Sequence, residues 1–411
     1  MAFEPQVFTL SNGIKGVYLP NQSEVSHLGI TFLTGSRFET EKEMGIAHFL
    51  EHCIFKGTTK RKTYHILSRL DAVGGELNAY TAKEEMVVYA SFVKEHLKRA
   101  IELLADIVMN SNFPIKEIEK EKEIVLDEIN SYLDSPSDKI FDDFESLIYP
   151  NHSLGYNILG TPETVKSFTR EDLLQFMKKY FVTGNMVISY VGNIPLTKLI
   201  KWLSIYFKDM PVGPKNDQFF AFHSPVAQVK REKASNYQAH VIIGGMAPSY
   251  LDDDRRAMTL LINILGGPAL NSRLTLLIRE KHGFAYNVES NYTGYADGGF
   301  WSIYLGTDEK NVNKAIKLVY KEIKRIVQEP LTVKQLNQAK EQLIGQIALG
   351  MDSNAGLMLG LGKSLLFFDQ IDTIQDIHKE IDALTAEDLS KVAARYFDFK
   401  HISELVFELA N

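Results

Sequence analysis

The two halves of the sequence repeat the same order of elements, and this repeat constrains the fold more than any other feature. In each half an Ala-Ile-x-Leu tetrapeptide, at Ala100 and at Ala315, opens a predicted helix. A proline follows 14 residues later at Pro114 and 15 residues later at Pro330, and each proline precedes a long charged helix. A shared order of elements is typical of a duplicated unit. The chain of 411 residues is long enough for two such units.

Short predicted strands in each half are joined by turns, and the predicted helices are grouped between them. The strands are expected at 27–33, 87–92, 240–243 and 301–305, and helices at 46–55 and 258–265. This pattern favours an α+β fold, in which each of two tandem units has a mainly antiparallel sheet with helices packed on one face. The Pro- and Gly-containing stretch 210–216 predicts a boundary. We therefore expect domains at 1–212 and 222–411, joined by a linker at 213–221.

Composition excludes several classes of protein. With 45 Lys and Arg against 52 Asp and Glu, the net charge is −7, so we expect neither a nucleic-acid partner nor a membrane partner. The single cysteine, Cys53, cannot form an internal disulfide and fits a reducing compartment. Residues 1–13 lack a basic region followed by an apolar run, which predicts a first strand and no signal peptide. These features predict a cytoplasmic protein.

A pair of histidines predicts a metal site on the helix expected at 46–55. His48 and His52 are four residues apart, so their imidazoles lie on nearly the same helical face. Glu51 borders that face, where a carboxylate can act as general base without being a ligand. This His-x-x-Glu-His order is that of the inverted zincins. A solvated amphipathic helix is the alternative, but the apolar neighbours predict burial, and buried histidines need partners such as a metal.

A second helix, expected at 117–132, offers a third ligand. Glu121 and Glu128 are seven residues apart and share one stripe of the helix with Val125. The other glutamates of this helix are expected on a solvated face. Zinc usually takes three protein ligands and leaves a fourth position for water, although the same residues suit other divalent ions. Spacing alone does not choose between Glu121 and Glu128.

The run from His48 to Thr58, His-Phe-Leu-Glu-His-Cys-Ile-Phe-Lys-Gly-Thr, resembles the signature of the pitrilysin family of zinc peptidases. The similarity covers nearly the whole chain, and within the family it is greatest to short bacterial members and to the beta subunit of mitochondrial processing peptidase. The resemblance implies one Zn²⁺ per chain, held by both histidines and by Glu128. It also implies that Glu121 supports a ligand from behind.

The same resemblance implies which residues bind substrate. Asn78 and Ala79 match the strand with which family members pair an extended peptide. Arg279 and Tyr286 match an arginine–tyrosine element that contacts substrate in relatives, and both side chains can donate to a developing oxyanion. Without the family, Arg279 could instead pair with the neighbouring glutamate, and Tyr286 could be a core residue of a strand.

The sequence therefore predicts a zinc endopeptidase that cleaves unfolded peptides or presequence-like segments, extended and basic or neutral, inside the chamber of a homodimer. The first alternative is a non-catalytic structural or assembly subunit resembling respiratory-complex core proteins, which the presence of every ligand and of the base disfavours. Another is a peptidase that needs a separate partner subunit, and the presence of both site elements in one chain favours the homodimer. Cys53 is expected to be a small buried apolar residue.

Overall fold

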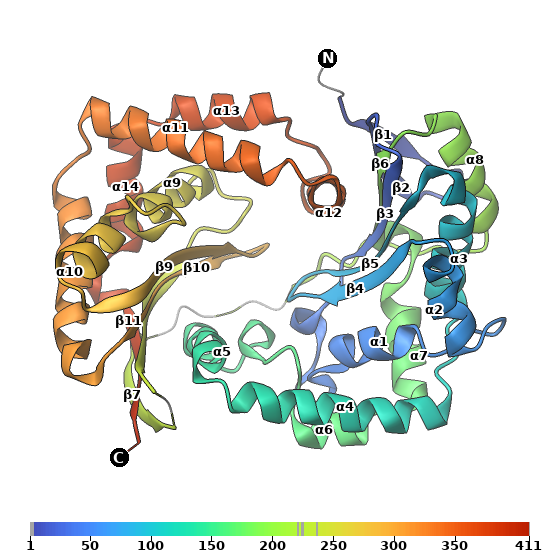
Figure 1. Cartoon of the computed structure of the whole chain (residues 1–411), viewed down its shortest axis with the longest axis horizontal. Helices are drawn as coiled ribbons and strands as arrows, with labels where there is room; N and C mark the ends of the chain where they lie inside the picture. Colours follow the sequence, from blue (N-terminus) through green and yellow to red (C-terminus); the bar gives the residue numbers. More distant parts are fainter. Residues whose placement is uncertain (1–3, 220–221, 223–225, 236, 411) are drawn as a thin grey trace. The chain divides into compact units, whose positions relative to one another are not determined.

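The computed structural model describes residues 4–219, 222, 226–235 and 237–410 (Figure 1). The chain forms two compact units, each built from segments that are distant in the sequence. The first unit combines Met1–Ile129, Tyr156–Phe219 and Gly350–Thr373, and the second combines Asn130–Gly155, Phe220–Leu349 and Ile374–Asn411.

In the described part of the first unit, the strands pair in the order β1-β2-β6-β3-β5-β4. Their bounds are β1 Gln6–Thr9, β2 Lys15–Pro20, β3 Val25–Phe32, β4 Glu76–Thr81, β5 Met86–Val93 and β6 Met186–Gly192. Neighbouring strands are antiparallel except for the parallel pair of β2 and β6. The helices that lie or begin in this unit are α1 Ile46–Ile54, α2 Thr63–Asp71, α3 Leu97–Asn110, α4 Ile115–Leu133, α6 Pro162–Ser167, α7 Arg170–Tyr180, α8 Leu196–Tyr206 and α12 Asn354–Phe368.

In the described part of the second unit, the strand order is β7-β11-β8-β10-β9. The strands are β7 Val229–Ala234, β8 Ala239–Ala247, β9 Ala285–Gly294, β10 Gly299–Thr307 and β11 Ser403–Leu409, and only β7 and β11 are parallel neighbours. The helices that lie or begin here are α5 Pro136–Ile148, α9 Arg255–Gly266, α10 Val312–Gln328, α11 Val333–Gly350, α13 Ile374–Ala383 and α14 Ala386–Tyr396. The predicted duplicated α+β architecture is thus confirmed.

A helix from the C-terminal half covers the second face of the first sheet. Along β3, Ile30 and Phe32 point to the face that carries α3 and α8, whereas Gly29 and Thr31 point to the opposite face, against α12 (Figure 1). The small residues let the helix approach closely: a Cβ on Gly362 of α12 would lie 2.8 Å from the Thr31 hydroxyl. Helices therefore cover both faces of this sheet, whereas the sequence predicts helices on one face only.

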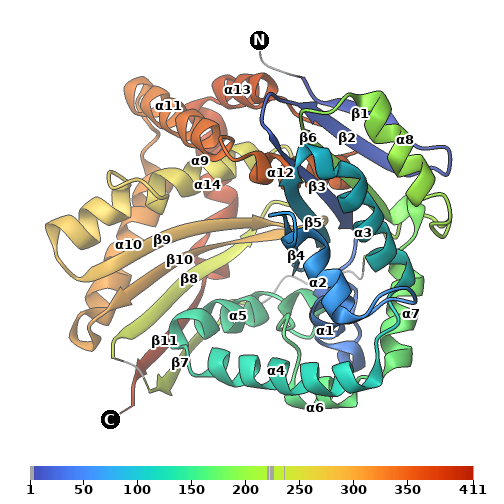
Figure 2. The same cartoon turned by 45° about the vertical axis from the view of Figure 1, so that its right-hand side comes forward.

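The second sheet is covered in the reciprocal way. Helix α5, from the N-terminal half, packs on β8 and β11 (Figure 2). Along β8, Val241 and Ile243 belong to the core formed with α9 and α10, whereas Ile242 packs with Phe144 of α5. Glycine again permits the approach, because a Cβ on Gly244 would lie 3.0 Å from the Phe144 ring.

This exchange of helices differs from the predicted contiguous domains. The predicted ranges 1–212 and 222–411 place α5 and α12 in the wrong unit, since each helix completes the core of the unit that the other half of the chain builds. The physical reason is that both faces of each sheet are apolar and need cover. Residues 213–219 of the predicted linker form no helix or strand, and residues 220 and 221 lie outside the described part of the chain.

We predict that Gly362→Ala destabilises the protein by about 1–3 kcal/mol, because the added methyl group forces α12 away from the buried hydroxyls of Thr31 and Ser189. The measurement is the urea midpoint followed by circular dichroism. Gly360→Ala is the matched control: it lies in the same helix, and its Cβ would meet no heavy atom within 4 Å. The control should match or exceed wild-type stability, and an equal loss in both variants would contradict close packing at Gly362.

Candidate metal centre and active site

Helices α1 and α4 bring the three predicted ligands together. His48 and His52 lie one turn apart on α1, and their ring centroids are 4.7 Å apart. Glu128 reaches them from α4, with its Oε2 atom 3.7 Å from Nε2 of His48 and 3.3 Å from Nε2 of His52. One donor atom from each residue lies within 4.8 Å of the other two. The structure therefore chooses Glu128 over Glu121 as the third member of the cluster.

The cluster fits a tetrahedral zinc ion. Ligand atoms about 2.0–2.1 Å from zinc lie roughly 3.3 Å from one another in a tetrahedral site, close to the separations seen here. Burial, followed by repulsion from His52, lowers the pKa of His48 to about 4, so its imidazole is neutral at pH 7, as a ligand must be. Buried His48 Nδ1 also has no hydrogen-bond partner among the described residues, so the ring is not committed elsewhere.

Glu51 stands beside this cluster without belonging to it. Burial raises the pKa of its carboxyl group, and Glu128 adds to the rise, while hydrogen bonds from Thr81 and the charge of His52 oppose it. Thr81 is the last residue of β4, and its hydroxyl also lies 3.5 Å from the Ala47 carbonyl of α1. The edge strand of the sheet therefore holds the predicted base against the metal helix.

Glu121 lies behind His52, as predicted for a supporting acid. It is 4% exposed, and its Oε2 atom is 3.3 Å from His52 Nδ1. Its other oxygen, Oε1, is 2.8 Å from Nζ of Lys56. The carboxylate thus contacts Nδ1, whereas Glu128 lies at the other ring nitrogen, Nε2. An outer partner at this position fixes the orientation of a ligating histidine.

Cys53 has the structural role that the sequence indicates. It is 1% exposed in the core of the first unit. Burial, with a further contribution from Glu121, raises the pKa of its thiol, so the side chain stays protonated. It does not belong to the cluster of possible metal donors.

The start of α1 is fixed by Glu39, a residue that the sequence analysis missed. The buried Glu39 carboxyl group accepts hydrogen bonds from the backbone N–H groups of Gly45, at 2.8 Å, and Ala47, at 2.9 Å, and burial raises its pKa to about 8. Gly45 is the N-cap of α1 and Ala47 lies in its first turn, and N–H groups at these positions have no partner within the helix. Gly45 itself has φ 92°, and a Cβ there would collide with the backbone of Gly160. Gly45, just before the motif, was the one sequence signal for a helix start. Nothing in the spacing of Glu39 indicated that it would cap this helix.

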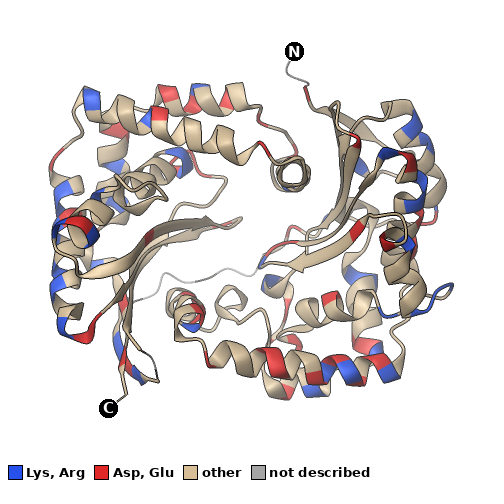
Figure 3. Cartoon of the chain, viewed as in Figure 1, with Lys and Arg blue, Asp and Glu red and all other residues tan. Residues whose placement is uncertain are grey.

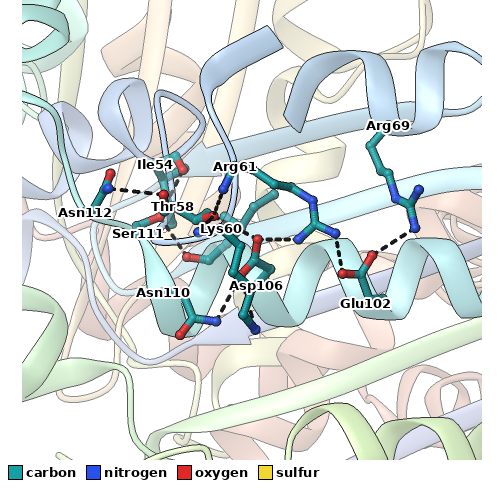
Figure 4. A network of polar contacts seen from close by, with 11 residues as sticks. Ile54, Thr58, Lys60, Arg61, Arg69, Glu102, Asp106, Asn110, Ser111 and Asn112 are labelled. Carbon is teal, nitrogen blue, oxygen red and sulfur yellow. Dashed lines mark hydrogen bonds and ion pairs between the residues drawn. The ribbon is translucent and has the colours of Figure 1, made fainter. Parts of the chain in front are cut away.

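The end of α1 is anchored by a polar network (Figure 4). Ser111 donates to the Ile54 carbonyl at 3.1 Å. In the following loop, Thr58 donates to the buried Asp106 at 2.9 Å, and Arg61 pairs with Asp106 and with Glu102 of α3. Helix α1 is thus held at both ends, which limits the directions that its histidines can take.

The arginine–tyrosine element lies in the second unit. Arg279 belongs to a π-helical turn, Thr275–Lys281, and Tyr286 is the second residue of the edge strand β9. The guanidinium carbon is 4.8 Å from the centre of the Tyr286 ring, and Nε lies 3.3 Å from the carboxylate of Glu280. The alternative pairing with Glu280 is therefore present, but Tyr286 is 81% exposed and is not a core residue. Both side chains line a hollow of about 440 Å³.

Asn78 and Ala79 lie on β4, the edge strand of the first sheet. Ala79 pairs with Val88 of β5 in the antiparallel register. In addition, the Asn78 side-chain oxygen accepts a hydrogen bond of 2.8 Å from the backbone N–H of Ala79. The structure thus places both residues on a strand edge where an added strand could pair. The backbone N–H group of Ala79, one donor for such pairing, is bonded to the Asn78 side chain.

Charges along α4 are more balanced than its glutamates suggest. Acidic and basic residues are interspersed over the first part of this helix, residues 116–123, whereas Asp127 and Glu128 follow without a basic residue (Figure 3). Glu117 pairs with Lys120 and Glu119 pairs with Lys122, each at 2.9 Å.

In the described part of the chain, no helix combines the length and apolar character needed to cross a bilayer.

Comparison with known families and proteins agrees with this arrangement. Residues 17–162 match the family described as Insulinase (Peptidase family M16), and residues 167–343 match the Peptidase M16 inactive domain. The first match contains the whole metal cluster. The second begins after it, in accord with one half of the chain carrying the ligands.

Relatives and solved structures extend the comparison over the entire chain. The chain is 33% identical to a protein of Bacillus subtilis named as an uncharacterized zinc protease, covering 98% of each sequence, and 33% identical to one of the same name from Rickettsia felis, covering 94% of each. Its fold is that of a peptidase M16 inactive-domain protein from Pseudomonas fluorescens, with TM-score 0.92, 20% identity and coverage of 99% and 98%. A protease from Helicobacter pylori shares the fold at TM-score 0.90, 20% identity and coverage of 99% and 100%. The closer similarity to the processing-peptidase beta subunit stays a prediction, whereas the identity to these relatives over the full length establishes that the chain belongs to the insulinase family, peptidase family M16.

Proposed function

We propose that the protein is a zinc-dependent endopeptidase that hydrolyses extended peptides. The observation that carries the proposal is the cluster of His48, His52 and Glu128, with the carboxyl group of Glu51 beside it and outside it. Three protein ligands and a separate carboxylate are the parts that metal-assisted hydrolysis requires. The names of the relatives, as zinc proteases, support the same metal.

Zinc bound by these residues would lower the pKa of a coordinated water toward about 7 and polarise a carbonyl oxygen. Glu51 accepts the proton of the attacking water and returns it to the amine of the departing peptide. Its raised pKa suits this exchange, because a carboxyl group that both takes and gives a proton works best near the operating pH. Thr81 holds the carboxyl group in place through hydrogen bonds from its side chain and backbone.

We further propose that the substrate pairs with β4 as an added strand. An incoming backbone displaces the Asn78 side chain from the Ala79 N–H group, so Asn78 covers the strand edge only while it is empty. Only an extended segment can pair in this way, which supports unfolded or presequence-like substrates. The net charge of −7 supports basic or neutral peptides.

A non-catalytic role is the second candidate, since one domain of the chain matches a family described as inactive. That match covers residues 167–343, which exclude all three ligands and the base. The described first unit retains the complete set, so we propose catalysis there and a supporting role for the second unit. The cytoplasmic location stays a prediction from the sequence.

We also propose that two copies of the chain associate and share their sites. Arg279 and Tyr286 of one protomer would then stabilise the transition state at the metal of its partner, inside a common chamber. The family resemblance supports this, because it implies that the arginine–tyrosine element contacts substrate, and the element lies in a different unit from the metal cluster. The exposure of Tyr286 and its contact with the half-buried Arg279 support a role outside the core.

The roles of base and ligand predict different losses on mutation. Glu51→Gln should keep zinc and lose at least about a thousandfold in kcat, because it removes proton transfer without removing a ligand. His52→Ala and Glu128→Ala should lose zinc and activity together. Metal analysis of the purified proteins and hydrolysis of a quenched peptide measure both properties. A folded Glu51→Gln protein without zinc would contradict the assignment.

The shared site predicts recovery of activity on mixing two inactive variants. Glu51→Gln and Tyr286→Phe, each impaired when pure, should regain about a quarter of wild-type activity after equimolar subunit exchange, because half the dimers are mixed and each holds one intact site. Native mass spectrometry verifies the exchange. The control is a mixture of Glu51→Gln and His52→Ala, which should recover nothing, because both changes lie in the metal part of the site. If each chain completes its own site, the first mixture recovers nothing.

A further inference from the structure

We infer that Lys56 is a positioning residue for the metal centre, acting on His52 through Glu121. The lysine ammonium, the carboxylate and the imidazole form a row in which each oxygen of Glu121 has a different partner. Oε1 contacts Lys56 Nζ at 2.8 Å, and Oε2 contacts His52 Nδ1 at 3.3 Å. On its far side, His52 presents Nε2 toward Glu128 at 3.3 Å.

Burial makes the lysine necessary for this arrangement. The Glu121 side chain is 5% exposed, and a carboxylate so far from water needs a partner for each oxygen. His52 satisfies only one of them. Without a partner at Oε1, the carboxylate is free to turn, and Oε2 is no longer held toward Nδ1 of His52. A hydrogen bond from Nδ1 to this oxygen is what leaves the lone pair on Nε2 for a metal.

Hydrogen bonds of its backbone groups hold Lys56 in position. The Lys56 N–H group donates to the Cys53 carbonyl at 3.0 Å, directly after α1, and its carbonyl accepts from the Thr63 hydroxyl at 2.7 Å. The loop that follows is tied to α3 by Arg61 and Asp106 (Figure 4). The side chain is 25% exposed, so its ammonium keeps access to water while its charge faces Glu121.

A neighbouring lysine does not duplicate this contact. Lys122 adjoins Glu121 on α4, and its side chain is 14% exposed, but its ammonium pairs with Glu119 at 2.9 Å. Both lysines also influence the thiol of Cys53, which places them at the same side of the site. Lys122 therefore supplies a matched control with equal charge, similar burial and no contact with the relay.

The inference rests on the proposed zinc site, but its test does not depend on peptide hydrolysis. Zinc affinity is measured by competition with a chromophoric chelator on the full-length protein. Lys56→Met should weaken zinc binding about tenfold, within the range found when the outer partner of a ligating histidine is removed. Lys56→Arg should stay within about threefold of wild type, because it restores a cation, and Lys122→Met within about twofold.

A double-mutant cycle separates positioning from a general effect of charge. In a Glu121→Gln background, Lys56→Met should change zinc affinity by less than about twofold, because the group through which it acts is gone. Equal losses in both backgrounds, or an equal loss in Lys122→Met, would overturn the relay. So would wild-type affinity in folded Lys56→Met. Absence of zinc binding by the wild-type protein would instead overturn the proposed function together with this inference.

Discussion

The metal centre depends on one constraint above all: buried hydrogen bonds hold α1 at both of its ends. Glu39 accepts hydrogen bonds from two N–H groups at the start of the helix, and Ser111 donates to the carbonyl of its last residue, Ile54. Four residues separate the two histidines, so fixing the axis of this short helix fixes both imidazoles at once. Only the third ligand, Glu128, must then come from another element, and its long helix is packed through Val125 and Ile129 in the same core.

Both sheets are covered through an exchange of helices between the two halves of the chain. Helix α12 covers the first sheet and α5 covers the second, so neither half of the sequence completes its own core. Glycines on the covered faces, Gly29 and Gly244, let each helix approach the strands. Loss of either helix would expose apolar strand residues, which couples the stability of each half to the presence of the other.

Much of the site was predictable because its chemistry is local. The spacing within the His-x-x-Glu-His run placed three side chains on one helix, and the structure confirms their grouping. Spacing did not decide whether Glu121 or Glu128 is the third ligand. In the structure Glu128 lies at Nε2 of His52, on the side of the metal cluster, and Glu121 lies at Nδ1. The arginine and tyrosine are stacked on one another, yet Arg279 also keeps the pairing with Glu280 that the sequence allowed.

The sequence by itself determined the duplicated α+β units, because the two halves share one order of elements. It also determined several helices and strands and the histidine pair, because these depend on periodicity over a few residues. Only the tertiary structure decided two of the partners that hold the site: Glu39 at the start of α1, and Lys56 beside Glu121. It also decided which half supplies the cover of each sheet. Such contacts join residues that no local period relates, and burial makes them strong, since an unpaired charge or donor away from water is costly.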